Sequence, residues 1–145
     1  MIALLARKSR AAFDVLIAST AVVRARWTVA QRPIGTLVRT DGDVLSMTTG
    51  TPLAAEDRRR GERWGAAVDR ALRWLPGDAA CLVRASALRN LVVTRGLPRA
   101  VVCVGVRRGA AGFQAHAWVA QDGTPIAEPE ALRGAFTSLD GVTLD

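Results

Sequence analysis

Cys81 and His116 are the residues of this chain whose types and positions best suit covalent chemistry. The sequence holds two cysteines and a single histidine. A thiolate can attack a carbonyl carbon, and an imidazole can take the thiol proton and later return it to a leaving amine. The two residues lie far apart in the sequence, so only the fold can bring them together.

Cys81 lies near the start of a predicted helix. Asp78 is a good N-cap, the apolar pattern continues to about Arg95, and Gly96 is a typical C-terminal stop. Cys81 then occupies the first turn, where unpaired N–H groups and the helix dipole favour a thiolate. The alternative is a small buried thiol, as free cysteines often are. Cys103, in the middle of an apolar run, fits that alternative.

His116 belongs to a predicted strand from Phe113 to Ala120, on the face that also carries Gln114 and Trp118. A lone histidine in a strand is more often a packed or surface residue than a catalyst. The cysteine at a helix start favours catalysis, because Cys–His chemistry needs a nucleophile on a rigid helix end and a base on a facing sheet. Trp118 could wall a substrate pocket or belong to the core, and the Gln114 side chain could contribute to an oxyanion hole.

Two acidic residues after the histidine could orient its ring, Asp122 and Glu128. Asp122 is better explained as a turn residue, because it precedes Gly123 and Asp-Gly is preferred at hairpin tips. Glu128 lies on the predicted return strand. It is therefore the candidate third member of a Cys–His–acid triad.

The length of the hairpin loop decides which way Glu128 points. A two-residue turn at Asp122-Gly123 would place Glu128 opposite Ala117, on the wrong face of the sheet. A three-residue loop, Gln121–Gly123, would place it opposite His116, and glycine bulges of that kind are common. We predict the three-residue loop.

The order of the predicted elements indicates an α+β fold, with N-terminal helices followed by a small antiparallel sheet packed on the cysteine-bearing helix. We expect a single domain over residues 1–145, with a helical N-terminal region and loop at 1–50 and the core at 51–145. The predicted elements are helices from Ile2 to about Trp27, from Thr51-Pro52 to Leu75 and from Asp78 to Arg95, a loop or weak hairpin over Ile34–Gly50, strands at Val101–Val106, Phe113–Ala120 and Thr124–Glu128, and a short helix at Glu130–Phe136.

The composition narrows the choice of partners. The net charge is +7 and only one basic residue is a lysine, but the arginines are spread along the chain and tyrosine is absent. A nucleic-acid binder would gather them on one face with stacking aromatics, so an acidic peptide or protein is the better partner. Arg84, Arg89 and Arg95 could meet such acidic groups or simply be solvated. One histidine and two cysteines lack metal-ligand spacing, so we expect no metal.

The sequence indicates a cytoplasmic protein. The longest uncharged stretch near the N-terminus, Val15–Val23, is nine residues, whereas a spanning helix needs ~20. No convincing signal peptide is present, and two cysteines do not form a disulfide framework. Both features fit a reducing compartment.

Three blocks in this order and spacing resemble a known family: CLVRA from Cys81, RGLP from Arg95 and AHAWV from Ala115. They resemble the leader peptidases of lasso-peptide biosynthesis, a branch of the papain-type, transglutaminase-like fold. The resemblance implies a stand-alone cysteine peptidase without a cofactor. It would remove the leader from a ribosomally made precursor peptide before a macrolactam-forming cyclase acts, aided by a leader-recognition protein. Glu128 matches the position of the family's acid, which is usually Asp.

Two other functions remain open at this level. A transglutaminase-like module could keep the fold but bind or present the precursor peptide without cutting it. A different acyl transfer, such as amidase or cross-linking activity, could use the same Cys–His pair.

Overall fold

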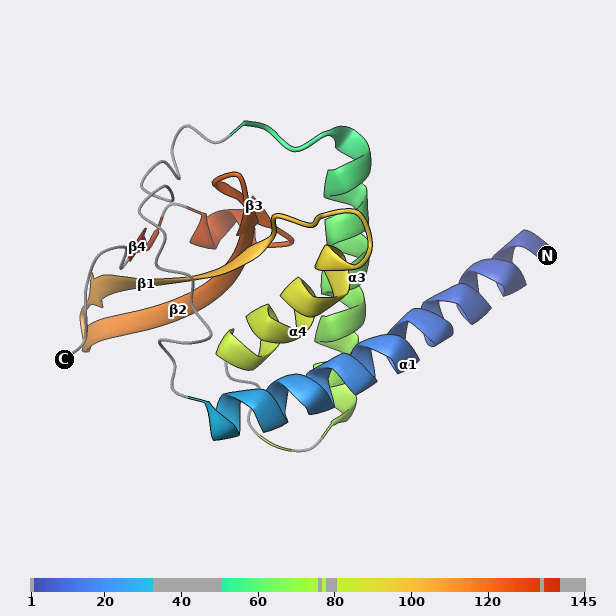
Figure 1. Ribbon diagram of the computed structural model, residues 1–145, viewed down its shortest axis with the longest axis horizontal. Coiled ribbons are helices and arrows are strands. Elements are labelled where there is room, and N and C mark those ends of the chain that lie inside the picture. The colour runs from blue at the N-terminus through green and yellow to red at the C-terminus, as the bar shows by residue number, and fades with distance from the viewer. Residues whose placement is uncertain (1, 33–50, 76, 78–80, 134, 139–145) are drawn as a thin grey trace.

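The computed structural model describes residues 2–32, 51–75, 77, 81–133 and 135–138 (Figure 1). Within these ranges, three α-helices pack beside a four-stranded antiparallel sheet, which confirms the predicted α+β class. The predicted loop at 34–50 and the predicted cap Asp78 lie outside the described residues. The elements are α1 Ile2–Gln31, α3 Ala55–Trp74, α4 Cys81–Val93, β1 Val101–Gly109, β2 Gly112–Gln121, β3 Thr124–Ile126, the 3-10 helix η1 Glu130–Leu132 and β4 Thr137–Ser138.

The helix α1 crosses both other helices (Figure 1). It contains neither glycine nor proline and continues to Gln31, four residues beyond the predicted end. Its inner face carries the buried small residues Ala18, Ala21 and Ala25. Small side chains let the helix axes approach closely, which suits the crowded junction of three helices.

The helix α3 begins later than predicted. Its N-cap is Ala54, with no side-chain cap hydrogen bond, so the proposed Thr51-Pro52 start is wrong. The Thr51 carbonyl instead accepts a 3.0 Å hydrogen bond from the Thr124 hydroxyl, which ties this segment to β3. Acidic residues in the first turn, Glu56 and Asp57, complement the helix dipole in place of a cap.

One hydrophobic core joins the helices to one face of the sheet. Buried residues come from α1 (Val22), α3 (Val68), α4 (Leu88 and Val92) and β2 (Val119). The predicted glycine stop follows helix α4. Gly96 takes a positive φ of 103°, and the Leu97 amide donates a 3.0 Å hydrogen bond to the Val92 carbonyl. The cysteine-bearing helix is thus held firmly against β2.

The sheet has the strand order β3-β2-β1-β4, with β2 lying between β1 and the short edge strand β3. Gln121 pairs with Thr124, so the hairpin between β2 and β3 has a two-residue turn and the predicted three-residue loop is wrong. Asp122 and Gly123 both have positive φ, 51° and 79°, as a type I′ turn requires. The twist of that turn matches the strands, which explains why the shorter turn forms.

The two faces of β2 have different surroundings. Ala117 and Val119 pack on the helices, whereas Trp118 and Ala120 join Cys103 in a smaller cluster on the opposite face. His116 shares the face of Trp118. It lies beyond the end of β3, where the edge of β2 no longer has a paired strand.

None of the described helices combines the length and apolar character needed to span a bilayer.

Candidate active site

Cys81 is the first residue of α4. Its side chain is half-buried at the margin of the main core, and the thiol is not part of a disulfide. Amides in the first turn of a helix have no partner within the helix, so they remain able to stabilise an anion. No hydrogen bond joins the thiol to the imidazole of His116 among the described side chains.

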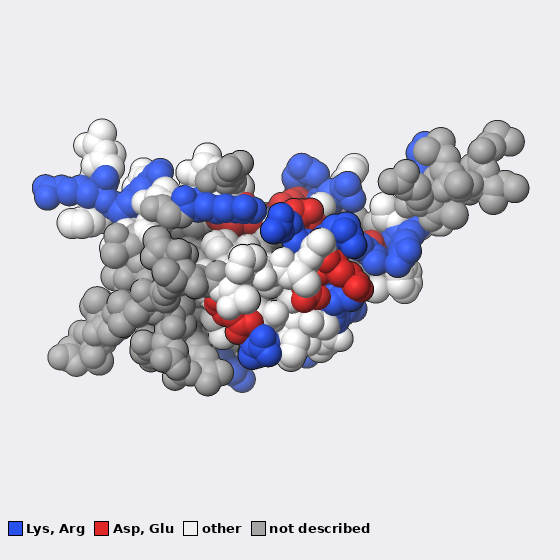
Figure 2. Space-filling view, turned by 90° about the horizontal axis from the view of Figure 1, so that it is seen from above, with Lys and Arg blue, Asp and Glu red and all other residues white. Residues whose placement is uncertain are grey.

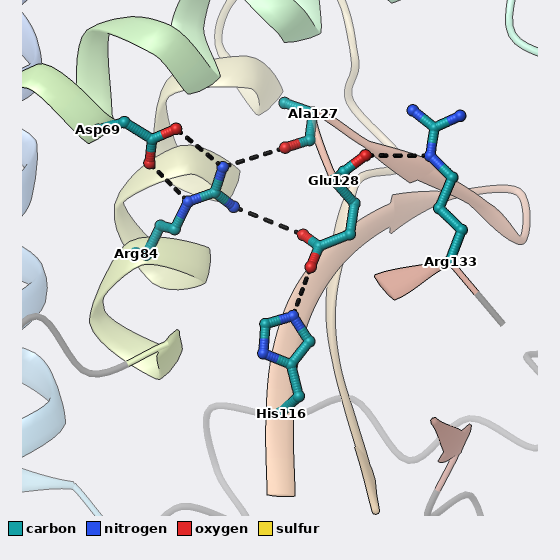
Figure 3. Close-up of polar contacts among 6 residues, drawn as sticks. All are labelled: Asp69, Arg84, His116, Ala127, Glu128 and Arg133. Carbon is teal, nitrogen blue, oxygen red and sulfur yellow. Dashed lines mark hydrogen bonds and ion pairs between the residues drawn. The ribbon is translucent and has the colours of Figure 1, made fainter. Parts of the chain in front are cut away.

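His116 and Glu128 contact each other directly. Nε2 of His116 lies within hydrogen-bonding distance of Oε1 of Glu128 (Figure 3). The Glu128 side chain is 3% exposed and the His116 side chain 18%. An ionised carboxylate only accepts hydrogen bonds, so a neutral His116 ring that donates to it carries its proton on Nε2 and leaves the Nδ1 lone pair free.

Glu128 reaches His116 because the chain leaves the strand immediately before it. Strand β3 ends at Ile126, and Ala127 adopts a left-handed conformation with φ of 51°. Continuing the strand would have put Glu128 opposite Ala117. The turn at Ala127 redirects the next side chain toward the imidazole.

Two glycines of α3 make room for this turn. A Cβ built on Gly61 would lie 2.5 Å from Cγ2 of Ile126, and one built on Gly65 would lie 2.4 Å from Cβ of Ala127. Real Cβ atoms do not approach so closely. The glycines therefore allow the end of β3 to rest directly on the helix backbone.

Arg84 contacts the other side of Glu128 (Figure 3). Its Nη1 lies 3.5 Å from Oε2 of Glu128, and its Nη2 donates a 3.0 Å hydrogen bond to the Ala127 carbonyl. Nε and Nη2 also donate to the carboxylate of Asp69 on α3, at 2.7 and 3.2 Å. From the sequence, Arg84 was expected to face solvent or an acidic partner, whereas the structure places it inside this network.

Arg84 also shares helix α4 with the cysteine. Residues three apart lie on the same side of a helix, so Arg84 is one turn beyond Cys81 on a shared face. Burial lowers the pKa of the Arg84 guanidinium, but the hydrogen bond and charge of Asp69 and the charge of Glu128 raise it by more. The guanidinium is therefore a permanent positive charge between two carboxylates.

Aromatic rings hold the imidazole on its own face of the sheet. The His116 ring stacks on Trp118, with 6.1 Å between centroids and 17° between planes, and meets Phe136 at 5.1 Å. Trp118 is 5% exposed, so most of its surface supports the ring and the smaller cluster. Its predicted contact with a substrate stays a prediction.

Gln114 is exposed, two residues before His116 on the same face. Its Oε1 accepts a 2.8 Å hydrogen bond from Nε of Arg107. The amide nitrogen is left as the group that could donate to a substrate. Its predicted oxyanion role stays a prediction.

The other two arginines considered for an acidic partner, Arg89 and Arg95, make contacts within the protein. Arg89 donates to the Ala100 carbonyl at 3.3 Å, and Arg95 donates to the Leu91 carbonyl while its guanidinium lies 4.4 Å from the Trp64 ring centroid. On the face shown in Figure 2, basic side chains form separate groups, several with acidic side chains between them. Within the described ranges no three His, Cys, Asp or Glu residues cluster as a metal site would require.

Comparison with known proteins identifies the family of the chain. The family model described as the transglutaminase-like superfamily matches residues 15–140, a range that includes α3, α4, β2 and β3. Searches of curated proteins and of solved structures found no match. The match covers most of the sequence and includes Cys81, His116 and Glu128. The chain belongs to the transglutaminase-like superfamily.

Proposed function

We propose that this protein is a cysteine peptidase that removes the leader from a ribosomally made lasso-peptide precursor. The observation that carries the proposal is the contact of Nε2 of His116 with the buried carboxylate of Glu128. This contact leaves Nδ1 as the base for a thiol. Membership of the superfamily supports cysteine chemistry, and the CLVRA, RGLP and AHAWV blocks support the precursor as substrate.

In the proposed mechanism, Nδ1 of His116 accepts the Cys81 proton and the thiolate attacks the scissile carbonyl carbon. The backbone N–H of Cys81 at the start of α4 stabilises the oxyanion, and the Gln114 amide is the candidate second donor. Nδ1 then protonates the leaving amine as the C–N bond breaks. A water, deprotonated by Nδ1, hydrolyses the thioester and regenerates the thiol. Glu128 stabilises the imidazolium in both steps.

The proposed setting is a cytoplasmic biosynthetic assembly. A leader-recognition protein would deliver the precursor, and a macrolactam-forming cyclase would use the released core peptide. No cofactor takes part in the proposed steps. We expect cleavage of a full precursor to be faster with the recognition protein than without it.

A second candidate is a module that binds or presents the precursor without cutting it. It is favoured by the absence of a hydrogen bond between the thiol and the imidazole among the described residues. Hydrogen bonds between catalytic groups often form only once substrate is bound, so this observation alone does not decide between the two.

The decisive experiment begins without a substrate. Iodoacetamide labelling of Cys81 at pH 7 should be fast in a Cys103→Ala background and about ten-fold slower after His116→Ala, because an adjacent base generates thiolate. Precursor cleavage, followed by mass spectrometry with the recognition protein present, should be lost in Cys81→Ala. Equal labelling rates together with an uncut precursor would leave the binding module as the function.

A further inference from the structure

Arg84 joins three segments that come from different parts of the sequence. It arises from α4, holds Asp69 of α3 through two hydrogen bonds, and reaches the Ala127 carbonyl and the Glu128 carboxylate beyond β3 (Figure 3). Its side chain is 19% exposed. A partly buried guanidinium with this many partners is held in one orientation.

The charges in this cluster alternate in sign. The Asp69 carboxylate binds the Arg84 guanidinium, and that guanidinium faces the Glu128 carboxylate. The Glu128 carboxylate in turn contacts the imidazole of His116. Glu128 is buried, and an ionised carboxylate is strongly disfavoured in such a place without a cation. His116 is a cation only when its ring carries two protons, whereas a guanidinium is always charged, so Arg84 is the permanent cation beside this carboxylate.

The two oxygens of Glu128 have separate partners. Oε1 faces Nε2 of His116, whereas Oε2 is buried and makes no hydrogen bond with the described residues. The nearest cationic atom to Oε2 is Nη1 of Arg84, at 3.5 Å. Holding Oε2 on this side turns Oε1 toward the imidazole.

We propose that Arg84 is a positioning residue that fixes His116 in its Nε2–H tautomer. It holds the Glu128 carboxylate in one orientation, so that Oε1 accepts the hydrogen bond from Nε2–H and Nδ1 is left for the thiol. The catalytic meaning of this tautomer depends on the proposed peptidase function, but the tautomer itself does not. Arg84 also lies one turn after Cys81, so the same side chain ties the nucleophile's helix to the acid.

A lysine at position 84 could not make the same set of contacts. A guanidinium presents five donors in a planar fork, which lets Arg84 meet Asp69, Ala127 and Glu128 at once. An ammonium group has the same charge but is compact and flexible. Arg84→Lys therefore separates the effect of charge from that of geometry.

The test uses the fact that His116 is the only histidine. Long-range proton–nitrogen NMR spectra of the whole chain contain one imidazole, and they distinguish its Nε2–H from its Nδ1–H tautomer. We expect the Nε2–H form in the wild type and a mixture in Arg84→Gln and Arg84→Lys. Iodoacetamide labelling of Cys81 should slow by about ten-fold in both, because less of the imidazole then presents an unprotonated Nδ1.

Arg89→Gln is the matched control, because Arg89 lies on the same helix and, among the described residues, its side chain donates to the Ala100 carbonyl and not to the network. It should leave the tautomer and the labelling rate unchanged. If Arg84→Gln fails to fold, as judged by circular dichroism, Arg84→Lys decides. An unchanged tautomer and labelling rate in a folded Arg84 variant would overturn the inference. A tautomer that depends on Arg84 in a protein that never cuts the precursor would refute the peptidase function alone.

Discussion

Glu128 contacts His116 although the strand register directs it toward Ala117. The pairs from Gln121–Thr124 to Val119–Ile126 extend to that position, and only the left-handed turn at Ala127 breaks the pattern. A non-glycine residue in this conformation is disfavoured by roughly 1–2 kcal/mol. The surrounding packing on α3 must offset this, which is the usual situation where a backbone exception orients a functional side chain.

Substitution of Glu128 tests whether this contact matters for the chemistry. Glu128→Gln removes the charge that stabilises the imidazolium, and Glu128→Asp withdraws the carboxylate by one methylene from Nε2. We expect both to lower the rate of precursor cleavage, by on the order of 10²-fold for Gln, measured under single-turnover conditions.

Asp122→Asn is the control for that experiment. Asp122 was the other candidate acid, but its carboxylate is held by Arg99 at the hairpin tip, with oxygens 2.9 and 2.6 Å from the guanidinium nitrogens. Its replacement should leave the cleavage rate unchanged. Full activity in Glu128→Gln would remove Glu128 from the mechanism.

Gly65→Ala tests whether the turn at Ala127 depends on its close approach to α3. Alanine favours helix by about 1 kcal/mol over glycine, yet its Cβ would lie 2.4 Å from that of Ala127. Overpacking of this kind typically destabilises by about 1–3 kcal/mol, so the substitution should lower the urea midpoint and also slow Cys81 labelling, because Glu128 shifts with Ala127.

Ala66→Gly is the companion variant on the same helix. Ala66 is exposed, so this change weakens the helix by about 1 kcal/mol without touching β3. Labelling of Cys81 should then keep its wild-type rate. If Gly65→Ala proved more stable than the wild type with unchanged labelling, the end of β3 could not depend on α3 in this way.

The periodicity of the sequence was enough to predict the fold class, the three helices and the strand that carries His116. Local signals acted as expected there, since Gly96, the predicted C-terminal stop, ends α4 with a positive φ. The start of α3 could not be read, because Thr51 makes a contact with β3 instead of capping the helix.

The candidate site could be predicted from the sequence less completely than the fold. Pattern alone placed Cys81 at a helix start and proposed Glu128, but it assigned the wrong loop length. The compensating turn occurs at Ala127, and alanine carries no signal for a left-handed conformation. The structural role of Arg84 was missed because its partners Asp69 and Glu128 are distant in sequence, and helical spacing does not reveal which charges meet in the fold.

The Asp14–Arg63 pair provides a test of how α1 is attached. Both Asp14 oxygens accept from Arg63, at 2.5 and 2.7 Å, and the Asp14 side chain is 8% exposed. Arg63→Ala would leave this carboxylate buried without its cation and should destabilise the protein by about 1–3 kcal/mol. Urea unfolding measures the effect.

Two further variants sharpen that measurement. Asp14→Asn in the Arg63→Ala background should recover part of the stability, because the buried charge is gone. Arg70→Ala, an exposed neighbour on α3, should change the urea midpoint little. Equal midpoints for Arg63→Ala and the wild type would mean that the apolar face of α1 holds the helix without help from this ion pair.

The hairpin tip should make a pH-dependent contribution to stability. The hydrogen bond from Arg99 lowers the pKa of Asp122 below its usual value of 3.8, despite slight opposition from burial. A carboxyl whose pKa is lower in the folded state stabilises the fold above the unfolded-state value and loses that effect as the pH falls through the folded-state value. Asp122→Asn, which tolerates the left-handed turn, should therefore be less stable than the wild type at pH 7.

The same comparison at low pH identifies the cause. Below the folded-state pKa of Asp122 the carboxyl is neutral in both states, so the urea midpoints of the wild type and Asp122→Asn should converge as the pH falls through that pKa. High salt at pH 7 should narrow the difference too, since the side chains of Arg99 and Asp122 are 71% and 38% exposed. A gap that persists in acid would instead assign the effect to the turn backbone, because that conformation does not titrate.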